Sequence, residues 1–184
     1  MNVAFRKPMT VAQYLARAAE PGETRRSELI NGQIVMMSPE RVEHIEAKFA
    51  AVLALTNAIA RARLPCHALA DGATVQVDDH TAYEPDALVY CGQKLPRGSL
   101  IVPDPVIVVE VLSPTTAHTD TSAKLIGYFK LASVKHYLII DPEARTVTHH
   151  TRARDGVLAS RTLKAGSISL DPPGLTLEAG DLMG

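Results

Sequence analysis

Apolar residues change their spacing several times along the chain, and each change predicts an element. Residues 10–20 begin with Thr10 and Gln13, whose spacing is that of a capping box, so we expect a short lead-in helix. Residues 28–37 contain two short apolar runs around Asn31-Gly32. Both residues of a tight hairpin turn need positive φ, which this dipeptide tolerates. The pattern therefore predicts a helix followed by a β-hairpin.

A longer helix is predicted next, over residues 38–63. Ser38, Pro39 and Glu40 provide a cap, a proline at the first helical position and an acid in the first turn. Apolar residues then follow helical spacing, and Pro65 lies just beyond the expected end. The positions with this spacing are Val42, Ile45, Phe49, Val52, Leu53 and Ile59.

The middle of the chain alternates between strand-like runs and turns. Residues 68–77 and 85–90 are predicted strands separated by a turn at residues 78–80, and the proline-containing residues 92–105 are a predicted loop. Residues 106–113 are almost continuously β-branched, which is typical of a strand covered on both faces. We expect this strand at the centre of the sheet.

Helical and strand patterns alternate once more before the chain becomes antiparallel in character. After a polar interval at residues 114–119, we expect a helix over about 120–131 and a buried strand over 137–141. A hairpin over about 146–164, on the sheet edge, precedes a tail rich in proline and glycine. This order predicts an α/β protein. Because no linker or repeat interrupts it, we expect one domain over residues 1–184, with its core at about 24–142.

Composition and charge exclude several classes of protein. The chain has 46% hydrophobic and 21% charged residues, which is ordinary for a globular protein and too apolar for intrinsic disorder. Its 19 Lys and Arg residues against 20 Asp and Glu residues give a net charge of -1, which excludes a uniformly cationic nucleic-acid coat. No apolar run approaches the roughly 18 residues of a membrane helix, and none follows Arg6 and Lys7 as in a signal peptide. We expect a cytoplasmic protein.

Cys66 and Cys91 are the two cysteines of the chain. Neither has a second cysteine or a ligand-spaced histidine beside it, so the pattern indicates neither a zinc knuckle nor a disulfide framework. We interpret them as two small thiols in a reducing compartment.

Glu110 is the one charged residue within residues 106–112, where both faces of the strand are expected to be covered. A buried carboxylate needs a cation, a proton or a metal, because an uncompensated buried charge is very costly. Asp86 opens the preceding strand, which a short loop joins to the Glu110 strand. Two such carboxylates about 4 Å apart repel by about 4 kcal/mol at an effective dielectric near 20, and a divalent cation removes that repulsion. Oxygen ligands without a Cys or His cluster favour Mg²⁺ or Mn²⁺.

Lys124 is expected level with Glu110 if the helix that follows packs back over the strand. It shares a helix face with Tyr128 and Leu131 and could bind a phosphate oxygen or help to activate a water. Ordinary structural roles stay open for all three residues. Glu110 could simply pair with a basic side chain of the covering helix, Asp86 could be a solvated acid at a strand start, and Lys124 could be an exposed helix lysine.

Four sequence strings carry a resemblance to a known family. They are EPDALVY, PVIVVEVLSP, TDTSAKLIGYF and ELINGQIVMMSP, and together with a histidine in the predicted long helix they resemble the Uma family of bacterial restriction-endonuclease-like proteins. The resemblance covers about residues 10–141. It implies the PD-(D/E)XK nuclease superfamily, whose core is a mixed central β-sheet flanked by helices.

The resemblance also implies roles for individual residues. Asp86, Glu110 and the backbone carbonyl of Val111 match the metal ligands. Leu112 stands where the superfamily motif has a lysine, and Lys124 resembles the migrated substitute. Two further matches are Glu28, as a metal-water contact or a structural bond to the hairpin backbone, and His44, with catalytic and structural roles both open.

These features predict a Mg²⁺- or Mn²⁺-dependent endonuclease that hydrolyses nucleic acid, with DNA as the expected substrate. Two alternatives are a non-catalytic binding module on the same fold and a Mg²⁺-dependent hydrolase of a small phosphoester. The oligomeric state stays open, with a homodimer and a higher homo-oligomer among the alternatives. At a net charge of -1, cations must cluster locally to hold a polyanion. Candidates for such contacts are Lys94, Arg97, Arg152 and Arg154, with Arg161 and Lys164.

Overall fold

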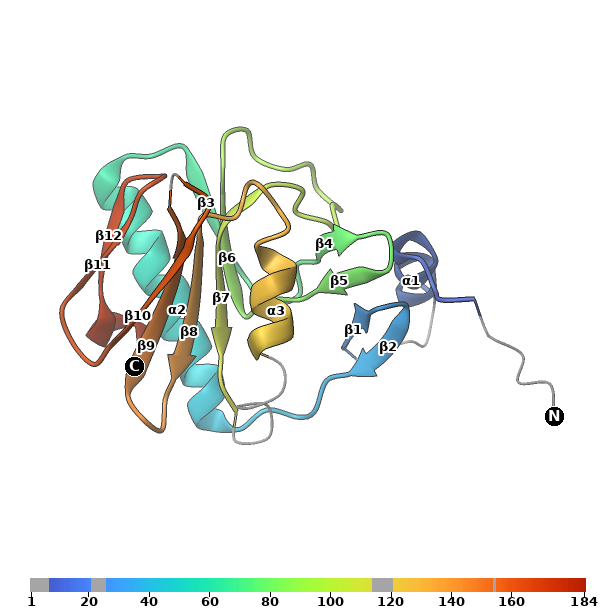
Figure 1. Cartoon of the computed structure of the whole chain (residues 1–184), viewed down its shortest axis with the longest axis horizontal. Coiled ribbons are helices and arrows are strands. Elements are labelled where there is room, and N and C mark those ends of the chain that lie inside the picture. Colours follow the sequence, from blue (N-terminus) through green and yellow to red (C-terminus); the bar gives the residue numbers. More distant parts are fainter. Residues whose placement is uncertain (1–6, 21–25, 114–120, 154) are drawn as a thin grey trace.

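A six-stranded mixed β-sheet forms the centre of the molecule (Figure 1). The computed structural model describes residues 7–20, 26–113, 121–153 and 155–184. The strand order in the sheet is β10-β9-β8-β7-β6-β3. These strands are β3 (Cys66–Ala70), β6 (Ala87–Cys91), β7 (Pro105–Val111), β8 (His136–Asp141), β9 (Thr146–Arg152) and β10 (Leu158–Leu163).

The predicted central strand is β7, which lies between β6 and β8. Its pairing with β8 is parallel, whereas every other pair in this sheet is antiparallel. A parallel pair requires a crossover connection, and the helix α3 (Thr121–Tyr128) lies within it. The predictions of an α/β fold, of β7 and of β8 are confirmed. The predicted polar interval at residues 114–119 lies outside the described residues.

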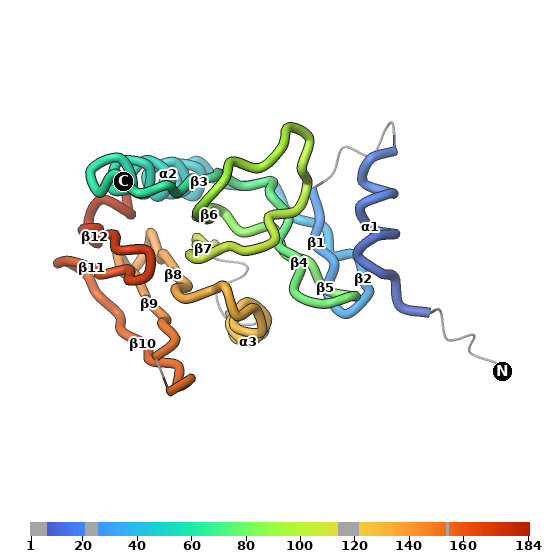
Figure 2. The backbone as a smooth tube through the Cα atoms, turned by 90° about the horizontal axis from the view of Figure 1, so that it is seen from above, coloured from blue at the N-terminus to red at the C-terminus, as the bar shows by residue number. Residues whose placement is uncertain are grey.

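The two faces of the sheet are covered by different helices. Figure 2 shows α2 (Val42–Ala62) on one face and α3 on the other. Because strand residues alternate between faces, Ile107, Val109 and Val111 pack in the apolar cluster beneath α2, whereas Val108 packs in the cluster beneath α3. Glu110 therefore belongs to the α3 face.

The long helix begins later than predicted and turns an unexpected side to the sheet. Its N-cap is Arg41, without a side-chain cap, so the expected first-turn acid Glu40 precedes the helix and accepts a hydrogen bond from Lys48. Its predicted end is confirmed, with Arg63 in the left-handed conformation at φ 52. Small residues face the sheet, whereas several large apolar residues used to predict the helix face solvent. The buried alanines are Ala47, Ala51, Ala54 and Ala58.

A smaller sheet lies at one end of the molecule, in the order β2-β1-β5-β4. The predicted hairpin is confirmed as β1 (Ser27–Ile30) and β2 (Gln33–Met36), with Asn31 and Gly32 at φ 50 and 76. The lead-in helix α1 (Val11–Ala18) has the predicted Thr10 capping box. The prediction of one strand over residues 68–77 is wrong. The start of that segment belongs to β3 in the six-stranded sheet, and its end belongs to β4 (Val75–Asp78) in the smaller sheet. β4 pairs there with β5 (Thr81–Tyr83), a strand that was not predicted.

The C-terminal region contains more structure than the sequence pattern indicated. The predicted edge hairpin is confirmed as β9 and β10, but it is not terminal. The proline- and glycine-rich tail folds into a second hairpin, β11 (Ser167–Leu170) and β12 (Leu175–Glu178), and ends in the 3-10 helix η1 (Ala179–Leu182). Its apolar residues alternate along both strands and pack in the cluster beneath α2. This short alternation was hidden by the turn residues around it.

Cys66 and Cys91 form a disulfide, so the interpretation of two separate thiols is wrong. Their separation of 25 residues gave no local sign of pairing. The antiparallel register of β3 and β6 places the two residues directly opposite each other, which no spacing rule in the sequence reveals. The described part of the chain contains no helix that is both long enough and apolar enough to cross a membrane.

Candidate active site

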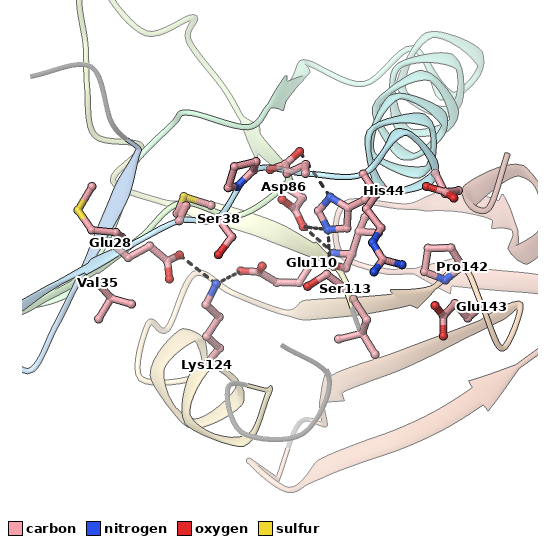
Figure 3. A pocket seen from close by; sticks show the side chains of 18 residues that line it. Glu28, Val35, Ser38, His44, Asp86, Glu110, Ser113, Lys124, Pro142 and Glu143 are labelled. Atoms are coloured by element: carbon pink, nitrogen blue, oxygen red, sulfur yellow. Dashed lines mark hydrogen bonds and ion pairs between the residues drawn. The ribbon is translucent and has the colours of Figure 1, made fainter. Parts of the chain in front are cut away.

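A cavity of about 550 Å³ opens beside the C-terminal end of β7 (Figure 3). Its wall is formed by β1, β2, the start of α2, the end of β7 and α3, together with Pro142 and Glu143 after β8. All six residues predicted for the catalytic and metal-binding positions line it. They are Glu28, His44, Asp86, Glu110, Val111 and Lys124.

Asp86 lies one residue before β6 and is 5% exposed, so the alternative of a solvated acid is wrong. The register of β6 with β7 pairs Ala87 with Val109, and continuing it by one residue places Asp86 opposite Glu110. The backbone N–H of Val111 donates to Asp86 Oδ2 at 2.7 Å, and Lys48 Nζ lies 2.7 Å from Oδ1. Both carboxylate oxygens are therefore held by donors from elements that flank the cavity.

Lys124 connects Glu28 and Glu110 on the other side of the cavity. Its Nζ donates to Glu110 Oε1 at 3.0 Å and to Glu28 Oε1 at 2.9 Å, and its side chain is buried. The prediction that Lys124 lies level with Glu110 is confirmed, and the alternative of an exposed lysine is wrong. Gly127 lets α3 approach closely, because a Cβ there would lie 2.6 Å from the Tyr83 ring. The small residue thus lets α3 pack closely against Tyr83 of β5.

Glu110 is buried and lies near other carboxylates. Burial, the largest effect, and the nearby Asp86 and Glu28 raise the pKa of its carboxyl, and Lys124 acts to lower it. The resulting pKa is about 8. The hydroxyl of Tyr128, which shares the α3 face with Lys124, donates to Glu110 Oε1 at 2.7 Å. The alternative that Glu110 pairs with a lysine of the covering helix is confirmed in its geometry. A cation beside Glu110 would stabilise its charged form further.

Glu28 bonds to a different backbone segment from the one expected. Its Oε1 accepts from the backbone N–H of Glu84 at 2.8 Å, just beyond β5, instead of bonding to its own hairpin. Glu84 itself contacts Arg26 with its carboxylate at 3.4 Å. Glu28 therefore ties the small sheet to Lys124 and, through it, to Glu110.

His44 reaches the same cavity from the first turns of α2. Its Nε2 lies 2.7 Å from the carbonyl oxygen of Val111 and 3.9 Å from Asp86 Oδ2. Its Nδ1 is buried and has no hydrogen-bond partner among the described residues, with Glu40 Oε2 at 3.5 Å. The ring is thus placed against the backbone oxygen that the resemblance implies as a metal ligand.

A second group of charges, which the sequence analysis missed, lies behind Asp86. Besides Asp86, Lys48 Nζ contacts Glu40 Oε1 at 2.5 Å and Asp71 Oδ2 at 2.9 Å, and Arg26 Nη1 contacts Asp71 at 2.7 Å. Lys48 is 6% exposed and lies four residues after His44, on the same side of α2. That spacing was the available signal, because it places a lysine in the stripe of α2 that faces the sheet.

The donor set suits a hard divalent cation. Asp86, Glu110 and the Val111 carbonyl supply carboxylate and carbonyl oxygens, the ligands that Mg²⁺ and Mn²⁺ prefer. The carboxylates of Glu40, Asp71 and Asp86 also lie within 4.8 Å of one another. Lys48 and Arg26 already lie among the acids of that second set, and Glu40 and Asp71 are partly solvated, whereas the acids that share Lys124 are more deeply buried.

The basic residues predicted to contact nucleic acid do not line this cavity. Arg152 is half-buried, and its guanidinium donates to the carbonyl oxygens of Phe129 and Leu131 at the end of α3. Arg154 lies outside the described residues. The other four are exposed on loops or on β10, namely Lys94, Arg97, Arg161 and Lys164.

Comparisons with known proteins agree with the fold and show the family. A family model named Uma2 and described as "Putative restriction endonuclease" matches residues 11–180. A protein of Synechocystis sp., described as uncharacterized, is 26% identical over 157 residues, which cover 84% of this chain and 87% of that protein. A crystal structure from Anabaena variabilis, described as a putative nuclease of the DUF820 group, superimposes with a TM-score of 0.76 at 20% identity. That match covers 96% of this chain and 98% of the other.

Proposed function

The chain belongs to the Uma2 family, and from this premise and the geometry of its cavity we propose that it is a metal-dependent endonuclease that hydrolyses DNA. One observation carries the proposal. Asp86, Glu110 and Lys124 come from three separate elements and meet in one cavity, with Lys124 Nζ 3.0 Å from Glu110 Oε1. Two acids and a lysine in that arrangement suit metal-assisted cleavage of a phosphodiester.

The proposed cation is Mg²⁺ or Mn²⁺, held by Asp86, Glu110 and the carbonyl of Val111. When bound, such an ion lowers the pKa of a coordinated water and offsets negative charge on the phosphate. The fit rests on the oxygen donors. Burial, with Asp86 and Glu28, raises the pKa of the Glu110 carboxyl, and a bound cation would favour its charged form. For Glu110 to act as a ligand it must lose its proton.

The residues around the cation would orient the reacting groups. Lys124, fixed between Glu28 and Glu110, presents an ammonium group that can orient the attacking water or hold a phosphate oxygen. Lys48 and the Val111 N–H fix the Asp86 carboxylate from behind and so limit its rotation. His44 keeps the Val111 carbonyl in place from the α2 side. These contacts preorganise the site, which reduces the reorganisation that the reaction requires.

A hydrolase of small phosphoesters is the second candidate, and the charge of the cavity wall favours it. Six acids line the cavity, whereas its fully charged cations are Arg41 and Lys124. Phosphate contacts dominate the affinity of proteins for nucleic acid, so this wall offers little to a long polyanion without bound metal. A small substrate would need fewer such contacts.

A cleavage assay with matched variants tests the proposal. Fluorogenic DNA and a small chromogenic phosphodiester would be incubated with the protein in Mg²⁺, in Mn²⁺ and in EDTA. We expect metal-dependent DNA cleavage that falls at least about 100-fold in Asp86→Asn and Glu110→Gln. Glu143→Gln, an acid of the same wall outside the proposed ligand set, is the matched control and should cleave normally.

Each contrary result has a distinct meaning. Cleavage of the chromogenic ester alone would replace the nuclease with the second candidate. If no substrate is cleaved although calorimetry shows Mn²⁺ binding that Asp86→Asn abolishes, the protein is a non-catalytic module with a metal site. Cleavage that persists in both ligand variants would refute the assignment of the site.

A further inference from the structure

One side of α2 carries large apolar side chains that face solvent. Val42, Ile45, Phe49 and Leu53 are 67%, 51%, 68% and 48% exposed. Their spacing of three or four residues places them in one stripe along the helix. In Figure 2 no labelled element lies beyond α2 on the side away from the sheet. The described part of the chain therefore leaves this stripe, which we call the outer stripe of α2, uncovered.

The composition of the chain makes the exposed stripe unusual. The sequence has 3 Phe residues and no Trp, yet Phe49 is among the most exposed large apolar residues. The side of α2 that packs on the sheet carries four alanines with Leu55 and Ile59, whereas Phe49 lies on the outer side. Scattered exposed apolar residues need no explanation, but a continuous stripe indicates an interaction surface.

The charges beside the stripe indicate what covers it. Glu43 and Glu46 lie near the N-terminal end of α2, and Arg61 lies near its C-terminal end, all three exposed. Glu43 and Arg61 are 18 positions apart, which is five turns at 3.6 residues per turn, so both point in the same direction from the helix axis. One flank of the stripe is thus acidic at one end and basic at the other.

We propose that the outer stripe of α2 binds the same stripe of a second copy of this chain, with the two helices antiparallel about a two-fold axis. Such an interface is isologous, so each contact occurs twice. Centred near position 52, it places Phe49 and Leu53 in the middle and Glu43 of each copy beside Arg61 of the other. A parallel arrangement would instead place Glu43 of the two copies on opposite flanks of the interface, with neither beside Arg61 of the other copy. The antiparallel one also opposes the two helix dipoles.

The interface would place the two cavities at opposite ends of the helix pair. Arg41, Glu43 and His44 line the cavity, and α2 spans 21 residues, or about 30 Å. Arg61 of the second copy would then lie near the mouth of each cavity. The dimer would thus supply a cation next to an acidic wall. The interface itself does not depend on the proposed nuclease activity.

Sedimentation velocity of the full chain between about 1 and 200 µM tests the interface. We expect a concentration-dependent dimer whose dissociation constant rises at least about 30-fold in Phe49→Asp/Leu53→Asp. Both residues are exposed, so the fold should survive, as circular dichroism and the melting temperature would verify. Two matched controls introduce an aspartate on other surfaces and should stay dimeric: Ile126→Asp on α3, 65% exposed, and Leu158→Asp on the β10 edge, 39% exposed.

Charge reversal tests the orientation of the helices. Glu43→Arg and Arg61→Glu should each weaken the dimer by about threefold to tenfold in low salt, and the double variant should restore it. A chain that stays monomeric up to 200 µM, or a dimer that survives Phe49→Asp/Leu53→Asp but not Leu158→Asp, overturns the proposal. If the double variant weakens the dimer by as much as the two single variants together, the antiparallel arrangement is overturned.

Discussion

Two buried lysines flank the site from opposite faces of the sheet, and they serve their acids differently. Lys124, from α3, is shared by Glu28 and Glu110, whose side chains are 6% and 12% exposed. Lys48, from α2, is shared by Asp86, Glu40 and Asp71, and the last two are 21% and 32% exposed. Arg26 adds a second cation to the Lys48 group, and acids outnumber cations in both groups, so the groups differ mainly in how deeply their acids are buried.

This difference between the two lysine groups indicates which of them can take part in catalysis. The Lys48 group has two cations for three acids, and two of those acids reach solvent, so water screens their charge while Lys48 fixes Asp86. Around Glu110, burial and two neighbouring carboxylates hold the pKa near 8, so the same region gains most from added positive charge. Lys48 is therefore a positioning residue in our proposal, whereas Lys124 faces the reacting groups.

Replacing each lysine by methionine should distinguish the two roles, and the largest difference is expected in the cleavage rate. If the proposed nuclease function holds, Lys124→Met should lower kcat/KM by about 10³-fold, because the ammonium is lost where the transition state forms. Lys48→Met should cost about 10-fold, since Asp86 keeps its bond from the Val111 N–H. Steady-state cleavage rates at saturating Mn²⁺ would measure both. Equal losses would show that the two lysines act alike.

The free energy of unfolding should also fall more in Lys124→Met than in Lys48→Met, for a different reason. Lys124→Met leaves two buried carboxylates without a cation and should reduce the free energy of unfolding by about 3 to 5 kcal/mol. Lys48→Met should cost less, because Arg26 remains and two of its acids reach solvent. Urea unfolding in EDTA would measure this. Adding Glu110→Gln to Lys124→Met should recover part of the loss, and no recovery would contradict the assigned contact.

Stability should also respond to pH in opposite ways at the two groups. In metal-free protein the folded Glu110 carboxyl has a pKa of about 8, above its ordinary value of 4.5, so the folded state holds a proton that the unfolded state has lost. The free energy of unfolding should fall as pH rises from about 5 to 8, by up to about 1.4 kcal/mol per pH unit. Unfolding curves for wild type and Glu110→Gln should therefore converge toward acidic pH; parallel curves would exclude the shift.

The carboxyl of Asp71 gives the opposite sign and a smaller effect. Burial acts to raise its pKa, but hydrogen bonds and charge from Lys48 and Arg26 lower it overall. Its contribution to stability is therefore present at neutral pH and lost only when the pH falls below its ordinary value of 3.8. Asp71→Asn should consequently lower the free energy of unfolding at pH 7, and its difference from wild type should shrink as the pH falls below 3.8.

The sequence predicted the Glu110 side of the site because the signal there was local. A lone charge in a β-branched run marked Glu110, and the strand–helix geometry placed Lys124 opposite it. Lys48 escaped notice because α2 is apolar nearly all round. The large apolar residues suggested that their own side of the helix packs on the sheet. The helix packs instead through the side that carries the alanines, and Lys48 lies on that side. Likewise, Asp86 was found while the charges behind it were missed, since Arg26 and Asp71, which contact each other, come from distant segments.

The disulfide between Cys66 and Cys91 gives the chain a covalent ring. β4, β5 and Asp86 lie inside that ring, whereas β7, with Glu110, lies outside it. A protease cut within the turn at residues 78–80 would therefore leave both fragments joined until a reductant is added. A cut in the loop at residues 92–104 would instead divide the polypeptide into two unlinked pieces, one carrying Asp86 and the other Glu110. Fragment sizes on reducing and non-reducing gels would thus report which connection holds the two acids together.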